Sequence, residues 1–288
     1  MTNLQDAFQW WDNLPMLWKE ILVVSQQLNS KIAKEKLRTI FTIKKYYYAT
    51  PRQIYEDLTK HRLDKTDFEH IEDYELSEIL ALNEVLCQNT LISNLTPLHF
   101  LPNLQLLFCH STPLKNVEAL AHHTQLRHLD CSKTYISSLA VLKNSTQIQT
   151  LICSDTPLKD LDVLAYCTKL KVLFCSKTPI QNLDVLAQCS QLQYLNISFT
   201  KIQNFDFLAK LPHLQILKCG MTNLKNLTLL QKAHNLEKLY LWGTNISDLS
   251  PLYQLPNLRR LDISFCKNIT KLKIWDFQVA QPNCKIIW

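Results

Sequence analysis

The stretch Leu126-Arg-His-Leu-Asp-Cys-Ser-Lys-Thr-Tyr-Ile-Ser-Ser-Leu-Ala-Val-Leu142 is one copy of a pattern that recurs every 22 residues. Between Leu82 and Leu258 the pattern L-x-x-L-x-C-x-x-T-x-[IL]-x-x-L-x-x-L begins nine times without insertion or deletion. With the first leucine counted as place 1, cysteine stands at place 6 in six copies and threonine at place 9 in eight. A fixed period of this length indicates a solenoid, in which each repeat buries its apolar side only against its neighbours.

Each repeat predicts one short strand followed by a segment that returns along the other side. Places 1, 4 and 6 of the strand are apolar and point inward, while places 3, 5 and 7 point outward. Nine such strands about 4.8 Å apart form a parallel sheet roughly 40 Å across on the concave side. The return segment has room for a turn or two of α or 3₁₀ helix on the convex side. Place 15 often carries a helix-capping residue type, as in Thr96-Pro97 and Ser250-Pro251, so we expect caps there.

Length and composition fit a well-packed protein of one large or two small units, because 47% of the 288 residues are hydrophobic. The longest apolar runs fall short of the roughly 18–20 residues of a membrane-spanning helix, so we expect no membrane partner. Residues 1–12 carry neither a basic segment nor an apolar core, so no secretion signal is visible. Ten cysteines without such a signal favour free thiols and a cytoplasmic location.

The formal charge of +6 is spread unevenly, with −2 over residues 1–78 and +8 over the remainder. A basic solenoid can meet an acidic partner or a phosphate backbone, although a solvated exterior explains the same charge.

The repeated line resembles the leucine-rich repeat. Its period and the motifs Leu95-Thr-Pro-Leu98 and Leu249-Ser-Pro-Leu252 are similar to the bacterial class that includes the internalins. Over residues 82–288 the resemblance implies an α/β leucine-rich-repeat solenoid with a parallel concave sheet and short convex helices. Gln281-Pro-Asn-Cys-Lys-Ile-Ile287 resembles the strand that closes such arrays, with Cys284 at place 1 and Ile287 at place 4. Threonine at place 9 stands where the family more often has asparagine, which implies that its hydroxyl makes hydrogen bonds between coils.

Residues 1–80 lack the repeat and are interpreted as an α-helical N-terminal cap, which leaves residues 81–288 for nine repeats and a closing strand. Apolar residues from Trp11 to Leu28 stand at helical spacing. Thr50-Pro-Arg-Gln53 has the form of a capping box that opens a second helix, and residues 73–80 predict a third. A cap at this end would cover the open edge of the first strand.

Two groups of side chains have the ingredients of chemistry, but packing and recognition explain them better. The cysteine column lacks the C-x-x-C or Cys/His pairs of a metal site, and buried cysteine packs as a small hydrophobe. His110, His128, Asp130 and Ser132 would share an open strand surface without an oxyanion turn, so we interpret them as a polar recognition patch. We therefore expect no catalytic residue, no metal and no cofactor.

Large apolar side chains at the outward places form the candidate binding surface, because a sheet face open to water should be mainly polar. Aromatic-rich patches mark interaction sites, and tyrosine and tryptophan commonly anchor interfaces. Shielding by the N-terminal segment, or strand propensity alone, explains the same pattern. A strip of lysines runs alongside at places 8 and 10. The candidate partner-binding residues are Phe108, Phe174, Tyr194, Phe199, Tyr240, Trp242, Phe265, Lys133, Lys177 and Lys201.

The sequence thus predicts a non-enzymatic cytoplasmic protein whose aromatic-rich concave face binds a protein partner. In the alternative, the lysine strip holds the phosphates of a nucleic acid and the aromatic rings stack on its unpaired bases. Asp130, Asp155 and Asp262 interrupt the face, which favours the protein partner.

Overall fold

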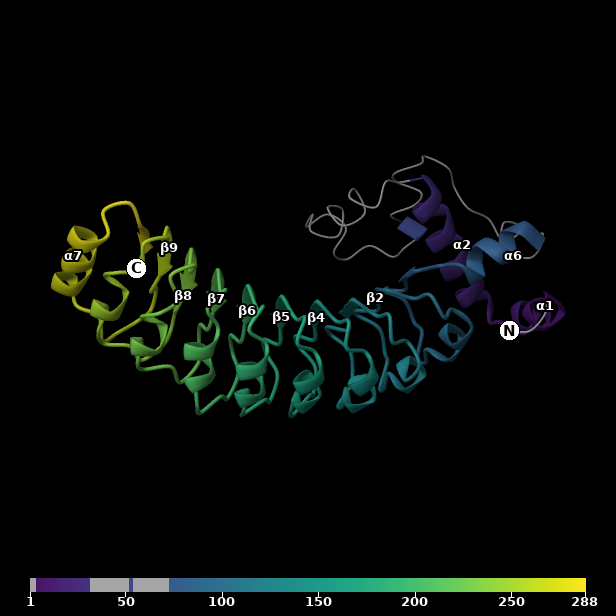
Figure 1. The fold of residues 1–288 in the computed structure, drawn as a ribbon, viewed down its shortest axis with the longest axis horizontal. Helices are drawn as coiled ribbons and strands as arrows, with labels where there is room; N and C mark the ends of the chain where they lie inside the picture. The colour runs from purple at the N-terminus through teal and green to yellow at the C-terminus, as the bar shows by residue number, and fades with distance from the viewer. Residues whose placement is uncertain (1–3, 32–51, 54–72) are drawn as a thin grey trace.

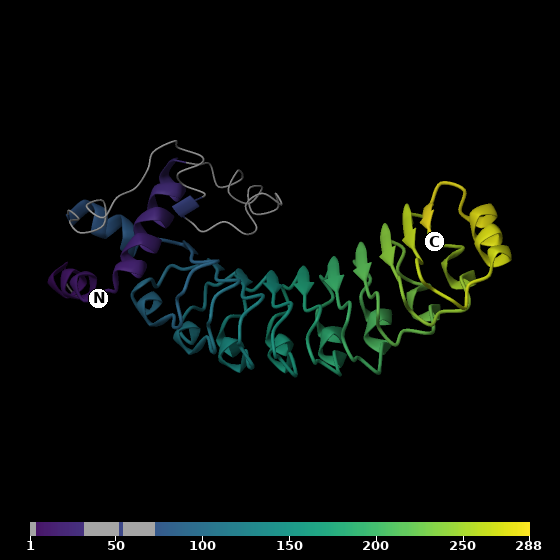
Figure 2. The ribbon, with the colours of Figure 1, turned by 180° about the vertical axis from the view of Figure 1, so that it is seen from behind.

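The computed structural model describes residues 4–31, 52–53 and 73–288. In the part of the chain that the structure describes, α1 (Leu4–Asp12), α2 (Met16–Lys31) and α6 (Asp73–Leu80) precede a long array of short strands. Figure 1 shows the array as an arc, with the strands along its concave side and short helices along its convex side. The view from behind in Figure 2 shows the same two layers, with the N-terminal helices at one end and α7 (Lys271–Ala280) at the other.

Ten three-residue strands pair in parallel and in chain order to form one sheet. The pairing joins residues at the same place of successive coils, as when Val85 lies opposite Leu107. The predicted concave parallel sheet is therefore confirmed. The strands are β1 (Glu84–Leu86), β2 (Leu106–Phe108), β3 (His128–Asp130), β4 (Thr150–Ile152), β5 (Val172–Phe174), β6 (Tyr194–Asn196), β7 (Ile216–Lys218), β8 (Lys238–Tyr240), β9 (Arg260–Asp262) and β10 (Lys285–Ile287).

The return segments form 3₁₀ helices of three to five residues, as the short spacing predicts. The expectation of caps at place 15 is wrong, because Thr96 and Ser250 are the first helical residues. The cap comes from place 13: Asn94 Oδ1 accepts from the Thr96 N–H at 3.2 Å, and Asp248 Oδ1 from the Ser250 N–H at 2.9 Å. These are Asx turns, which short polar side chains favour. The helices are η1 (Thr96–Phe100), η2 (Glu118–Leu120), η3 (Ala140–Asn144), η4 (Asp162–Tyr166), η5 (Asp184–Gln188), η6 (Asp206–Lys210), η7 (Thr228–Leu230) and η8 (Ser250–Leu252).

The cysteine column stacks as one interior row, as predicted. Its members are fully buried between the leucine columns and carry free thiols. The row consists of Cys87, Cys109, Cys131, Cys153, Cys175 and Cys219.

The threonine column corrects a second expectation. Thr156 Oγ1 donates to the carbonyl of Cys153 in its own coil at 2.6 Å, and the other seven column members bond in the same way. The short hydroxyl therefore closes a turn within one coil. Backbone hydrogen bonds join successive coils, as when the Phe199 N–H donates to the Gly220 carbonyl at 3.0 Å. In the threonine column, Thr244 also contacts the next coil, at 3.5 Å from Cys266 Sγ.

The N-terminal helices cover the first strand. Helix α2 packs against β1, and Ser25 Oγ accepts a hydrogen bond from the Leu86 N–H at 3.1 Å. The predicted helix over residues 73–80 is α6, and the apolar stretch from Trp11 forms parts of α1 and α2, which are separated at Leu14-Pro15. Of the helix expected to open at Thr50, the structure describes Arg52 and Gln53, which are helical; the rest lies outside the described residues.

The C-terminal end closes with α7 and β10. Thr270 caps α7 by accepting from the Lys273 N–H, and Ile274 and Phe277 of this helix are buried. Ile286 lies opposite Leu261, so Ile286 occupies place 4 and the predicted register, with Ile287 there, is wrong by one residue. The cause is α7, which replaces a 3₁₀ helix and so changes the number of residues in the last coil. A shift of one residue moves each side chain of the strand to the other face of the sheet.

Candidate partner-binding surface

The outward side of the first coils is covered. Leu86 and Gln88 are buried where α2 packs against β1. Phe108, expected to be an exposed anchor, is only 6% exposed, and its ring lies 4.4 Å from that of His128. The sequence could not indicate this burial, because outward places look alike in covered and open coils. The open part of the concave face therefore begins beyond these coils.

The polar cluster predicted on this face is part of a local turn. Asp130 Oδ1 accepts hydrogen bonds from the backbone N–H of Ser132 at 3.1 Å and from its hydroxyl at 2.7 Å. The same carboxylate-to-backbone bond recurs between Asp262 and Ser264 at 3.1 Å, in a coil without histidine. Burial lowers the pKa of His110. A bond that recurs without histidine indicates a structural role for the acid rather than the activation of a base.

Aromatic rings and cations lie side by side across β5 to β9. Phe174 lies 4.7 Å from Tyr194, measured between ring centroids. Lys218 Nζ lies 5.4 Å from the ring of Tyr194 and 5.4 Å from that of Tyr240. Arg260 approaches the far side of the strip, 5.6 Å from Tyr240. Contacts of this kind contribute about 0.5–1 kcal/mol each at exposed sites and hold the side chains in one arrangement. We call these five residues the cation–aromatic strip.

Every coil turns out of its strand through one left-handed residue at place 8. These nine residues have φ between +54° and +66°, and Gly243 is the sole glycine among them. Left-handed backbone costs other residues about 1–2 kcal/mol, and bulky side chains rarely adopt it. The residue pattern did not predict this row, although Asn89 and Gly243 are types that tolerate positive φ. The left-handed row consists of Asn89, Ser111, Lys133, Asp155, Lys177, Phe199, Met221, Gly243 and Phe265.

Three large apolar side chains of this row are exposed: Phe199, Met221 and Phe265, with 44%, 49% and 82% of their surface accessible. Phe199 meets the half-buried Trp242 edge to face, with ring centroids 5.0 Å apart. The exposed surface of these three side chains buries little apolar area and stands on costly backbone, which makes them the candidate anchors of this surface.

The chain has two glycines, Gly220 and Gly243, and both lie beside these exposed side chains. A Cβ on Gly220 would stand 2.3 Å from Cε2 of Trp242, so the indole lies directly over the Gly220 backbone. A Cβ on Gly243 would stand 2.5 Å from Sδ of Met221. Each glycine thus makes room for a large side chain of a neighbouring coil. We call Phe199, Gly220, Met221, Trp242, Gly243 and Phe265 the tryptophan patch.

The three lysines of the predicted strip do not form one site. Lys177 joins the tryptophan patch, since its Nζ lies 5.8 Å from the ring of Phe199. Lys133 is half-buried several coils away, and Lys201 lies at place 10, exposed and two residues beyond Phe199.

The charge of the open face comes instead from outward strand positions. Across β5 to β9 these positions and the left-handed row carry Lys177, Lys218, Lys238 and Arg260 against Asp262 alone. Within the described ranges none of the four cations is in an ion pair. The open face is therefore basic as well as aromatic.

The thiols offer no reactive or metal-binding site on this face. All ten cysteines are buried and free. Desolvation raises the pKa of Cys175 to about 12 and that of Cys167 to about 11, so both are protonated at neutral pH. Among residues 4–31, 52–53 and 73–288, no group of three His, Cys, Asp or Glu side chains is placed to hold a metal ion.

These features define the class of protein as a repeat solenoid with stacked parallel strands, buried leucine columns and one 3₁₀ turn per coil. The family model for leucine-rich repeats in two copies matches residues 234–276. The chain has the fold of a leucine-rich-repeat solenoid, and the solved structures that it resembles include internalin-type bacterial proteins. No curated protein sequence matches this one.

Three solved structures illustrate the likeness. An internalin (inlF) from Listeria monocytogenes is 23% identical with a TM-score of 0.68, over 74% of this chain and 62% of that one. Internalin C2 from the same species is 24% identical with a TM-score of 0.63, over 75% and 90%. The ectodomain of an Arabidopsis thaliana membrane receptor kinase, in complex with Casparian strip integrity factor 2, is 21% identical with a TM-score of 0.58, over 66% and 25%. This chain thus spans under two thirds of the inlF structure, and the likeness concerns the fold.

None of the helices in residues 4–31, 52–53 and 73–288 is long and apolar enough to cross a membrane.

Proposed function

We propose that this protein is a non-enzymatic interaction module that binds a protein partner on its concave face, with the tryptophan patch at the centre of contact. The observation that carries the proposal is the exposure of Phe199 and Phe265 in left-handed backbone. Aromatic anchors beside unpaired cations favour a partner with acidic and apolar side chains. Leucine-rich-repeat proteins commonly act in this way, and the plant receptor ectodomain is itself bound to a factor.

The dimensions of the open face suit such a partner. Strands β5 to β9 stand about 4.8 Å apart, and the cation–aromatic strip and tryptophan patch lie side by side across them. A standard interface needs about 800 Å² on each side, and only a few residues near its centre carry most of the binding energy. Trp242 fits that role, because its indole is half-buried and held by Phe199 and the Gly220 backbone.

A matched pair of substitutions tests the proposal. Trp242→Ala should weaken binding of a captured partner by about 2 kcal/mol or more. Tyr166→Ala removes another exposed ring, 57% accessible, from η4 on the convex side, and should leave binding unchanged. Affinity capture with wild-type and both variants, followed by calorimetry on the identified species, measures the difference. If Trp242→Ala and Tyr166→Ala lowered the binding affinity equally, the partner would not bind at the tryptophan patch.

The nucleic-acid alternative is decided by the same reagents. Lys177→Glu combined with Lys218→Glu should slow association with an acidic protein and flatten its salt dependence. If the captured species is a nucleic acid, and its binding survives Trp242→Ala but falls steeply with added salt, the protein-partner proposal fails.

Two further assignments remain proposals. We divide the chain into a helical cap over residues 1–80 and a solenoid over residues 81–288; the close of α6 at Leu80, just before β1, supports this division. We also propose a cytoplasmic location, supported by ten buried cysteines that are all unpaired.

A further inference from the structure

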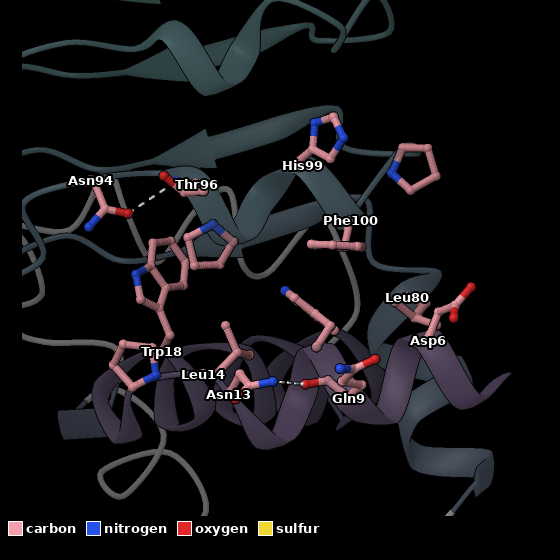
Figure 3. Close-up of a pocket in the computed structure, with 14 residues that line it drawn as sticks. Asp6, Gln9, Asn13, Leu14, Trp18, Leu80, Asn94, Thr96, His99 and Phe100 are labelled. Atoms are coloured by element: carbon pink, nitrogen blue, oxygen red, sulfur yellow. Dashed lines mark hydrogen bonds between the residues drawn. The ribbon is translucent and has the colours of Figure 1, made fainter. Parts of the chain in front are cut away.

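The two ends of the solenoid differ in how far other parts of the chain cover them. At the N-terminal end α2 packs against β1, and Figure 3 shows the pocket beside Trp10, where side chains of α1 face those of η1. The ring of Trp10 packs there against that of Phe100, with centroids 5.1 Å apart. At the C-terminal end β10 is the last strand of the sheet, and among the described residues no strand pairs with its outer edge.

Helix α7, which lies at this open end of the arc in Figure 1, carries apolar side chains on two sides. Phe277 is buried against the last coils, whereas Leu272, Trp275 and Val279 stand at positions i, i+3 and i+7 and share the outward side. These three and Trp288, which follows β10, have 61% to 67% of their surface accessible. We call Leu272, Trp275 and Val279 the outer stripe. Exposed apolar side chains that gather in this way mark an interaction surface.

Hydrogen bonds near both ends of α7 hold the helix on the solenoid. Lys273 Nζ donates to the Ser247 carbonyl, and the Gln281 side-chain amide donates to the Tyr253 carbonyl at 2.7 Å. The rings of Tyr253 and Phe277 lie 6.3 Å apart. The outer stripe is therefore presented on a fixed element.

Strand β10 adds an open backbone edge. The Lys285 N–H donates to the Arg259 carbonyl at 2.9 Å, and the Ile287 carbonyl accepts from the Ile263 N–H at 2.8 Å, so residues 285 and 287 face β9. Successive residues of a strand direct their backbone groups to opposite edges, so the N–H and C=O of Ile286 face away from β9. An edge of this kind is a template for pairing with another chain.

The exposed apolar surface at this end has the size that a dimer needs. A covered aromatic side chain buries about 150–250 Å², so Trp275, Trp288, Leu272 and Val279 together expose roughly 400–500 Å². A standard interface buries about 800 Å² on each side, and about 56–65% of that area is non-polar. The apolar share of one side is thus matched by these four side chains.

The charge beside the outer stripe suits a second copy related by a two-fold axis. Lys271 and Gln278 are exposed and lie along one border of the stripe, about two helical turns apart. If two α7 helices pack antiparallel with Trp275 at the axis, Lys271 of one copy lies within one residue of Gln278 of the other. The two Lys271 side chains are then about 12 Å apart along the helices, beyond the screening length of about 8 Å. Each lysine meets a neutral amide instead of its own copy.

We propose that this end of the solenoid binds a second copy of the chain through antiparallel packing of the two α7 helices, with the β10 edges in the same interface. A two-fold contact uses one surface twice, and it is the commonest symmetry of soluble oligomers. The outer stripe shares no residue with the tryptophan patch. Trp242→Ala, which tests the concave face, should therefore leave the dimer unchanged, and a monomeric chain would leave the proposed function untouched.

Sedimentation velocity of the full chain, from low to high micromolar concentration, tests the proposal. The wild-type chain should pass from monomer to dimer. Trp275→Ala should weaken the dimer at least about tenfold, because it removes an anchor that the two-fold axis uses twice. Tyr166→Ala removes an exposed ring from η4 and should change nothing. A chain that stays monomeric throughout, or a dimer that Trp275→Ala leaves intact, would overturn the proposal.

A charge change tests the antiparallel arrangement. Gln278→Glu should strengthen the dimer about threefold, because each new carboxylate meets Lys271 of the other copy in an exposed ion pair. In a chain that also carries Lys271→Ala, Gln278→Glu should no longer strengthen it. Strengthening that persists without Lys271 would contradict this packing, and thermal melting of each variant checks its folding.

A lipid surface is the other occupant that exposed tryptophans beside a lysine suit. The chain is therefore also sedimented with vesicles of phosphatidylcholine and phosphatidylserine. The dimer proposal expects no binding to these vesicles that depends on Trp275. A monomeric chain that binds them, and loses that binding in Trp275→Ala, would assign the outer stripe to a membrane surface instead.

Discussion

Replacing Gly220 by alanine tests how the tryptophan patch is built. The new Cβ would lie 2.3 Å from Cε2 and 2.4 Å from Nε1 of Trp242, closer than non-bonded atoms approach. The indole must therefore leave the Gly220 backbone, and its edge-to-face contact with Phe199 at 5.0 Å is lost.

The expected magnitude follows from three contributions. Overpacking costs about 1–3 kcal/mol, and an aromatic pair is worth about 0.5–1.5 kcal/mol. Alanine returns about 0.4–1 kcal/mol by restricting the unfolded chain, since φ of Gly220 is outside the left-handed region. Because the indole is only half-buried, the low end of the costs applies. We expect Gly220→Ala to lower the free energy of unfolding by about 1 kcal/mol.

A double-mutant cycle with Trp242→Ala isolates the cause. Without the indole, Gly220→Ala has nothing to displace and should stabilise the protein by about 0.4–1 kcal/mol. Urea unfolding of the four proteins, followed by circular dichroism, measures the change of sign. The same destabilisation with and without Trp242 would show that the indole does not lie over Gly220 and would refute the reasoning.

Three other predictions concern strain, hydrogen bonding and pH. Phe265→Gly should be more stable than Phe265→Ala by about 1 kcal/mol, because φ of Phe265 is +61°; equal urea midpoints would mean that the left-handed row is unstrained. Thr156→Val should lower the free energy of unfolding by about 1 kcal/mol, because the buried Thr156 hydroxyl donates to the Cys153 carbonyl at 2.6 Å. Thr124→Val changes an exposed threonine and should change the free energy of unfolding little in the same assay. Burial raises the pKa of Cys175 in the folded protein to about 12, whereas the ordinary thiol pKa is about 8.5. The protonated thiol therefore contributes its full stability below about pH 8.5, and this contribution is lost as the pH rises toward the folded pKa. Unfolding measured from pH 7 to pH 10 should show this decline, and Cys175→Ala should make it shallower; an unchanged slope would contradict the assignment.

The sequence predicts the interior of this protein well because each inward place is determined by one rule. Leu129 and Cys131 must face their counterparts in the next coil, and the period alone establishes this arrangement. The helix over residues 73–80 could be predicted from local pattern for the same reason. Outward places obey no such rule. Phe108 and Phe174 both occupy place 5, yet the first is buried and the second is half-exposed.

The errors share a physical origin in short polar contacts and in backbone conformation. The cap of η1 is Asn94 and not Thr96, because the Asn94 side-chain oxygen accepts from the Thr96 N–H and closes an Asx turn at the start of the helix. The left-handed row could not be read from residue type, since Phe199 and Met221 disfavour the conformation that they adopt. The pocket beside Trp10 depends on how two distant segments pack, which neither segment specifies alone.

The constant register of the sheet has a consequence for how this protein can change by recombination. An in-frame gain or loss of one whole coil restores every backbone pairing, so the array can grow or shrink without a new fold. The tryptophan patch limits where that can happen, because Phe199, Gly220 and Trp242 come from three successive coils. A crossover among them would separate the indole from its ring partner and its glycine, whereas one between β3 and β5 would leave them together. The patch is therefore inherited as one block, and the length of the solenoid before it is free to vary.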